Sequence, residues 1–184
     1  MEQISASNIV AKSNLGTTKP LFGSALLVFQ LADQLAAVSL KDVERITPLA
    51  ELACPPGLPP ALEGFLNLAG YAIPVLRLER LLALSPQRLD LYSLLIILRG
   101  PGGARFAIVV DRILRISQVS ENTLLSIGPK DSFNGCAEGT MTIENQLIHV
   151  LSASRILLKE EQETVAKFQS MAQQRLKQWE GPEA

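Results

Sequence analysis

Short apolar runs recur along this chain, separated by turn-forming residues, and this pattern restricts its possible folds more than any other feature. Seven such runs, from SALLVFQL at residue 24 to NQLIHVL at residue 145, have the length of strands rather than helices. The separators include Ala32-Asp33-Gln34, Pro55-Pro56-Gly57 and Gly100-Pro101-Gly102-Gly103. So many short strands in a chain of 184 residues predict a mainly β sandwich or barrels.

The second feature is a weak internal repeat with an offset of about seventy residues. Three matches occur in the same order along the chain, at offsets of 69, 70 and 75 residues. They pair SALLVFQL at Ser24 with SLLIILRG at Ser93, AVSLKDVERI at Ala37 with AIVVDRILRI at Ala107, and IPVLRLERLL at Ile73 with IHVLSASRIL at Ile148. We therefore expect two similar β-rich halves, each too small for a large core of its own, that share a hydrophobic seam.

The two ends of the chain have a different character. Residues 1–20 are polar and without periodicity, which predicts a flexible tail before the domain at residues 21–158. Residues 159–184 are predicted to form an amphipathic helix and a short tail. The helix should bury a stripe formed by Val165, Phe168, Ala172, Leu176 and Trp179. It could dock on the domain, or it could serve a partner or self-association.

Charge and hydropathy exclude several functional classes. Seventeen basic and eighteen acidic residues give a net charge of −1, so there is no general field for nucleic acid. No apolar run reaches the roughly 18 residues that a membrane helix requires. The first twenty residues lack the basic start and apolar core of a signal peptide. We therefore expect a soluble, cytoplasmic protein without direct membrane insertion.

The residues needed for catalysis or metal binding are scarce. His149 is the only histidine, and Cys54 and Cys136 are predicted to be buried free thiols rather than a disulfide. One histidine and two scattered cysteines do not supply a zinc site, and the glycines of RGPGGAR lack a phosphate-binding context. We therefore predict no cofactor, no metal and no enzymatic activity. A hydrolase that uses these three residues is the contrasting hypothesis.

Residues 58–82, LPPALEGFLNLAGYAIPVLRLERLL, carry a family resemblance. Their order of proline loop, Gly, Asn-containing strand, Gly turn and Pro-Val strand resembles the hallmark stretch of CheW-like chemotaxis coupling proteins. The matching residues are Gly64, Asn67, Gly70, Pro74 and Val75. The resemblance extends over residues 21–158 and implies two SH3-like five-stranded β-barrel subdomains packed together, with short helices between strands.

The same resemblance implies a function. CheW-like proteins are non-catalytic adaptors that couple a methyl-accepting chemoreceptor or another sensor to a CheA-type histidine kinase. We therefore expect a role in chemotaxis, twitching or phototaxis signalling, with both proteins as partners. The predicted contact residues lie near the hallmark: Val43, Arg45, Ile46, Phe65, Leu66, Tyr71 and Arg77.

The chain also departs from the family pattern at charged positions. Ala69 stands where the family has Arg, and Arg45 stands where its Glu partner is common. Arg77 replaces a frequent Asp. These changes motivate the hypothesis that the scaffold is kept while its polar partner surface is altered. A divergent CheW-like module that recruits a different signalling effector is therefore the alternative function.

Overall fold

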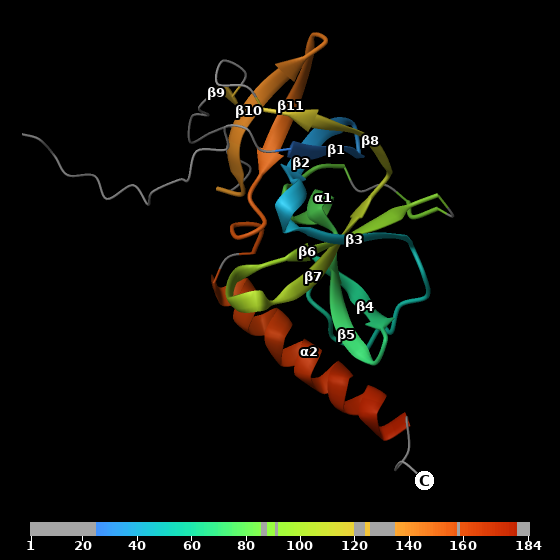
Figure 1. The fold of residues 1–184 in the computed structure, drawn as a ribbon. Coiled ribbons are helices and arrows are strands. Elements are labelled where there is room, and N and C mark those ends of the chain that lie inside the picture. The colour runs from blue at the N-terminus through green and yellow to red at the C-terminus, as the bar shows by residue number, and fades with distance from the viewer. Residues whose placement is uncertain are drawn as a thin grey trace, which may run out of the picture.

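Two β-sheets form the body of the protein, and a long helix crosses one of them (Figure 1). The computed structural model describes residues 25–85, 88–90, 92–119, 124–125, 135–157 and 159–179. The predicted tail at residues 1–20 lies outside these described residues. None of the described helices is long and apolar enough to cross a membrane.

The first sheet, sheet A, has six strands in the order β8-β1-β2-β11-β10-β9. Its strands β2 and β11 run parallel, and the other neighbours run antiparallel. The bounds are β1 Ala25–Leu31, β2 Gln34–Ser39, β8 Arg112–Gln118, β9 Leu124–Leu125, β10 Ala137–Ile143 and β11 Gln146–Leu151.

The second sheet, sheet B, has five strands in the order β3-β6-β7-β5-β4. It also has one parallel pair, β5 with β7, among antiparallel neighbours. The bounds are β3 Val43–Pro48, β4 Leu62–Leu68, β5 Tyr71–Leu76, β6 Leu94–Arg99 and β7 Arg105–Val110. The helices are η1 Leu40–Asp42, α1 Leu78–Leu81, η2 Pro101–Gly103 and α2 Lys159–Trp179. The mainly β class with short helices and a C-terminal helix is confirmed.

The repeat and the sheets are related by an exchange of strands. The three sequence matches equate β1 with β6, β2 with β7, β3 with β8, and β5 with β11. Replacing each strand of sheet B by its counterpart turns the order β3-β6-β7-β5 into β8-β1-β2-β11, which is the order in sheet A. Each sheet therefore combines strands from both halves of the repeat, whereas the sequence suggested two halves that pack against one another.

The β-bulges obey the same symmetry. The pairing register shifts at Glu44 in β3 and at Leu114 in β8, which are equivalent strands. It shifts again at Glu63 in β4 and at Glu138 in β10. Both Glu63 and Glu138 are followed by Gly. These two Glu-Gly pairs are a fourth match between the halves of the repeat, in addition to the three found in the sequence. A bulge bends its strand and raises the local twist, so both sheets bend at equivalent places.

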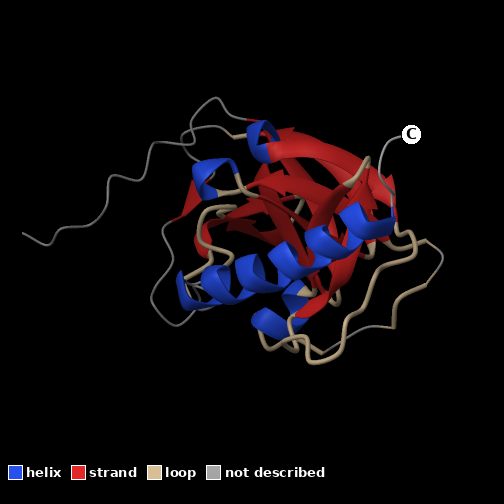
Figure 2. Cartoon of the chain, turned by 90° about the horizontal axis from the view of Figure 1, so that it is seen from below, coloured by secondary structure: helices blue, strands red, loops and turns tan. Residues whose placement is uncertain are grey.

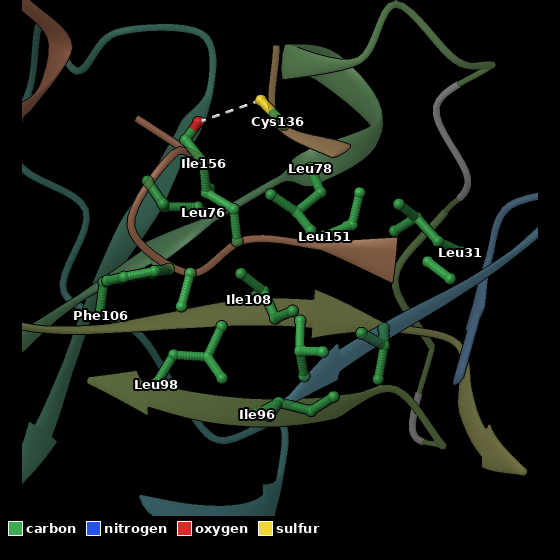
Figure 3. Packing of buried hydrophobic residues seen from close by; sticks show 14 of the residues in the cluster. Leu31, Leu76, Leu78, Ile96, Leu98, Phe106, Ile108, Cys136, Leu151 and Ile156 are labelled. Carbon is green, nitrogen blue, oxygen red and sulfur yellow. Dashed lines mark hydrogen bonds between the residues drawn. The ribbon is translucent and has the colours of Figure 1, made fainter. Parts of the chain in front are cut away.

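Both faces of the central strands are buried, as their two-sided apolar sequences predicted. In β6, Ile96 and Leu98 belong to a core cluster that also contains Phe29 and Val38 of sheet A. Figure 3 shows Leu31 and Leu151 of sheet A near Ile96 and Ile108 of sheet B. The alternate residues of β6 instead enter a cluster confined to sheet B and its loops. The shared cluster is the hydrophobic seam that the repeat predicted.

Helix α2 completes the exposed edge of β5 with side chains in place of a strand. Strand β5 pairs with β7 at Val75 and Leu76. Further upstream, the Gln169 Nε2 donates to the Ala72 carbonyl at 2.9 Å. Gln173 accepts from the Ala72 amide at 2.8 Å and donates to the Gly70 carbonyl at 2.6 Å. Pro74, next along the strand, has no N–H that needs a partner. The helix therefore satisfies an edge that would otherwise be open.

Helix α2 lies against the strands of the body (Figure 2), and its apolar side chains face them. Val165 and Ala172 are buried in the shared core cluster, and Phe168 and Leu176 pack against it. The helix is therefore docked, in agreement with one of the two sequence interpretations. Self-association through this stripe would first require the helix to leave the sheet.

Gly64 allows the segment before β4 to lie directly on that strand. The Ala53 and Phe65 amides each donate to the other residue's carbonyl at 2.9 Å. A Cβ atom on Gly64 would lie 2.9 Å from the Ala53 carbonyl oxygen and 3.0 Å from the Cys54 Sγ. Since the nearest atom belongs to the backbone, it cannot rotate away.

We therefore expect Gly64→Ala to lower the free energy of unfolding by about 1–3 kcal/mol, because the added methyl group forces a backbone shift. Urea denaturation of the purified chain measures this loss. Gly57→Ala is the control, since Gly57 has a φ of +80° but nothing within 4 Å of an added Cβ. It should lose only about 1 kcal/mol, the backbone cost of the left-handed conformation. Equal losses in the two variants would contradict the packing argument.

Candidate protein-binding surface

A row of charged and aromatic side chains lies at one end of sheet B. The Arg105 guanidinium carbon lies 4.9 Å from the centre of the Tyr71 ring, within the range of a cation–π contact. The Arg105 Nη1 also lies 3.3 Å from the Glu44 Oε1, and the Arg99 Nε lies 3.7 Å from the Glu44 Oε2. Tyr71 remains 57% exposed, so its ring is available to a partner.

Arg45 and Ile46 extend this row along β3, the outer strand of sheet B. Consecutive strand residues normally point to opposite faces. The bulge at Glu44 disturbs this alternation, and both Arg45 and Ile46 are exposed. Ile46 exposes 42% of its surface, while Val43 is half-buried. An exposed apolar side chain beside charged ones is typical of a protein contact surface. We call Glu44, Arg45, Ile46, Tyr71, Arg99 and Arg105 the β3–β5 surface.

The turn between β4 and β5 borders this surface. Ala69 and Gly70 form a two-residue hairpin loop, and both have positive φ, +50° and +81°. Such turns favour Asn and Gly, so Ala69 is an unusual choice. The Asn67 Oδ1 accepts a hydrogen bond from the Gly70 amide at 3.0 Å and stabilises the turn. The hallmark residues Asn67 and Gly70 are thus structural parts of the hairpin.

Three predicted contact residues are largely buried. Phe65 is 2% exposed, Leu66 is 6% exposed and Arg77 is 3% exposed. The first two belong to core clusters on opposite faces of β4, because neighbouring strand residues point to opposite sides. Their burial does not fit the contact role that the sequence suggested. The hallmark residues Pro74 and Val75 are also buried, next to one another in β5.

Arg77 is held in an ion-pair network at the start of α1. Its guanidinium pairs with the Glu79 carboxylate, and its Nη1 lies 3.5 Å from the Glu63 Oε2. The side chains of Arg77 and Glu79 expose 4% and 5% of their surface. Arg80 joins the network through Glu63 at 3.2 Å. A buried charge is tolerated only when it is paired. The Glu79 carboxylate therefore explains how an Arg can be buried at position 77, where the family resemblance implies Asp.

Three acidic residues outside the hallmark stretch each have a partner in the structure. Glu44 joins two arginines, as described above, and Glu144 pairs with Arg115 at 2.8 Å. The Asp111 Oδ2 accepts a hydrogen bond from the Ala32 amide at 2.8 Å and ties the β7–β8 junction to the β1–β2 turn. Burial raises the pKa of the Asp111 carboxyl above its ordinary value. These pairs join residues far apart in sequence, so local patterns could not reveal them.

The two cysteines are free thiols in different environments. Cys136 is buried, and its Sγ donates to the Ile156 carbonyl at 3.7 Å (Figure 3). Burial raises the pKa of this thiol. Cys54 is exposed, which contradicts the prediction of two buried thiols. It lies on the segment that pairs with β4 at the edge of sheet B, where solvent reaches one side. Among the described residues, no three His, Cys, Asp or Glu side chains form a group that could hold a metal.

Comparisons with known proteins agree with the fold. A family model described as the CheW-like domain matches residues 25–161. The chemotaxis protein CheW of Thermotoga maritima is 26% identical over 132 residues, which are 72% of this chain and 86% of that protein. The chemotaxis protein CheW of Treponema pallidum is 26% identical over 144 residues, which are 73% of this chain and 85% of that protein. The crystal structure of the scaffolding protein TtCheW from Thermoanaerobacter tengcongensis superposes with a TM-score of 0.68 at 22% identity, over 73% of this chain and 92% of that one.

If Arg77 is structural, Arg77→Met should lower the free energy of unfolding by about 3–5 kcal/mol, because it leaves the buried Glu79 carboxylate without its cation. The double variant Arg77→Met/Glu79→Leu should recover most of this loss, since both buried charges are then gone. Urea denaturation of the two single variants and the double variant measures this coupling. A stable Arg77→Met protein that has lost partner binding would contradict the assignment.

Proposed function

This chain belongs to the CheW-like family, and from this premise we propose that it is a non-catalytic adaptor that couples a chemoreceptor or sensor to a CheA-type histidine kinase. Its setting is the cytoplasmic side of a chemotaxis, twitching or phototaxis signalling system. Two curated relatives, both named chemotaxis proteins, match over 86% and 85% of their own length, which supports this role. We propose no substrate and no cofactor for it.

The single observation that carries the proposal is the pair of equivalent sheets. An adaptor must hold two proteins at once, so it needs two surfaces that do not obstruct one another. Strands β3 and β8 are equivalent in the repeat and form outer edges of different sheets. Each exposes an isoleucine, Ile46 in one and Ile116 in the other. One partner can therefore bind at each sheet.

We assign one of these contacts to the β3–β5 surface. Of the residues suggested by sequence, Val43, Arg45, Ile46 and Tyr71 remain at least partly accessible and retain this role. Ile46 and Tyr71 supply the apolar area that a partner would bury. Arg45, Arg99 and Arg105 give the surface a net positive character despite Glu44, so an acidic partner surface is favoured.

The organisation of the chain follows from the same proposal. Residues 21–158 form the adaptor body, and residues 159–184 provide the helix that closes the β5 edge. The N-terminal tail predicted for residues 1–20 lies outside the described residues. The family match ends at residue 161, so most of α2 is an addition to the matched region.

A divergent module that recruits another effector is the second candidate. Arg45 forms no ion pair with any described residue, and the residue at the hairpin turn is Ala69. The Glu–Arg pair implied by the family resemblance is therefore replaced by one unpaired positive charge. A kinase or receptor surface that complements the usual pair would meet a different charge pattern here.

We expect Ile46→Asp and Tyr71→Ala each to weaken binding of a CheA-type kinase regulatory domain or of a receptor signalling tip by about tenfold or more, equivalent to about 1.4 kcal/mol. Isothermal titration calorimetry with each purified partner measures the effect. Tyr92→Ala is the matched control, since Tyr92 is 82% exposed but lies outside the β3–β5 surface. Wild-type protein that binds neither partner, while a lysate pull-down returns a different effector, would favour the second candidate.

A further inference from the structure

A cavity of about 370 Å³ lies at the outer end of sheet B, and none of its lining residues belongs to the β3–β5 surface. The β4–β5 hairpin, the segment before β4 and the last turns of α2 enclose it. Its lining is mainly apolar and includes Pro55, Pro56, Phe65 and Leu176. Two of its walls are fixed, because Ala53 pairs with Phe65 and Gln173 joins α2 to the hairpin.

The polar groups of this cavity are hydrogen-bond donors. Arg175 lines it from α2, is exposed and forms no ion pair with any described residue. Asn67 lines it from β4, and its Oδ1 is already used by the Gly70 amide. The Asn67 Nδ2, which has no hydrogen bond to any described residue, and the guanidinium of Arg175 therefore remain to attract an acceptor. A carboxylate next to an apolar group complements this arrangement.

The form of the cavity favours a protein segment over a small molecule. Its mouth is formed by exposed residues, among them Cys54, Pro56, Asn67 and Arg175. A pocket for a small ligand normally buries most of the ligand's surface. This cavity is open to solvent and near the lower end of the usual size range, so it would leave much of such a ligand exposed. One bulky side chain, carried by a chain that continues across the surface, fits this form better.

We propose that this cavity, the α2–hairpin pocket, binds a segment of a partner protein in which a bulky apolar side chain is followed directly by Asp or Glu. The apolar side chain enters between the prolines and α2, and the carboxylate pairs with Arg175 at the rim. Arg175 and Leu176 lie beyond the region matched by the family model. The pocket is thus a third contact site, and its failure would leave the adaptor proposal untouched.

The test uses the full chain and a blocked tetrapeptide of sequence Gly-Phe-Asp-Gly, titrated by NMR. The backbone amides of Asn67, Ala72 and Leu176 should shift, and replacing the peptide's Asp by Asn should weaken binding by about fivefold. Arg175→Gln should remove this preference for Asp. Lys177→Gln, the same charge change on the same helix but outside the pocket, should keep it.

Equal affinity for the Asp and Asn peptides, or an equal effect of Lys177→Gln, would overturn the proposal. Phenylpropionate that binds more tightly than the peptide would also overturn it, in favour of a small-molecule site.

A second measurement uses the unaltered protein, so it does not depend on the folding of a variant. Cys54 lines the pocket and is exposed, whereas Cys136 is buried. N-ethylmaleimide should therefore modify Cys54 first, and saturating Gly-Phe-Asp-Gly peptide should slow this reaction severalfold. Mass spectrometry of the modified chain measures both rates. An unchanged rate at Cys54 in the presence of bound peptide would show that the peptide lies elsewhere and would overturn the proposal.

Discussion

Two parallel strand pairings, β2 with β11 and β5 with β7, are the contacts on which the rest of the structure depends. Each joins a strand from one half of the internal repeat to a strand from the other half. Without them, neither half could complete a sheet, and the apolar residues shared between the sheets would remain exposed. Folding of the two sheets is therefore coupled, and equivalent surfaces appear on both sides of one core.

This arrangement supports an adaptor function that is based on geometry. The two outer strands β3 and β8 place similar side chains on separate sheets, and Gln169 and Gln173 of helix α2 bind the part of β5 that lies outside its pairing with β7. These glutamine side chains satisfy backbone N–H and C=O groups of the β4–β5 hairpin. A helix in this place, unlike a further strand, presents no new strand edge with which another chain could pair and aggregate. Exposed apolar residues are thereby kept for the surfaces that bind partners.

Sequence alone predicted the class of fold, because strand-length apolar runs and the repeat reflect burial on two faces. It also predicted the C-terminal amphipathic helix, although it left open whether that helix docks on the domain. It could not predict the strand exchange, since similar halves can pair within themselves or with each other. The burial of Phe65 and Leu66 was not predicted, because an apolar residue beside a motif looks the same in sequence whether it is buried or exposed. The burial of Arg77 was not predicted because the pairing of two buried charges, Arg77 and Glu79, depends on tertiary packing that a local sequence pattern does not show.

The central claim is that the two sheets hold two partners at once. Sedimentation velocity of the full chain with a kinase regulatory domain and a receptor signalling fragment tests this most directly. If the claim is right, the three components together form a complex of one copy each, heavier than either pair. If the receptor fragment instead displaces the kinase domain, both partners use the same surface and the account is contradicted.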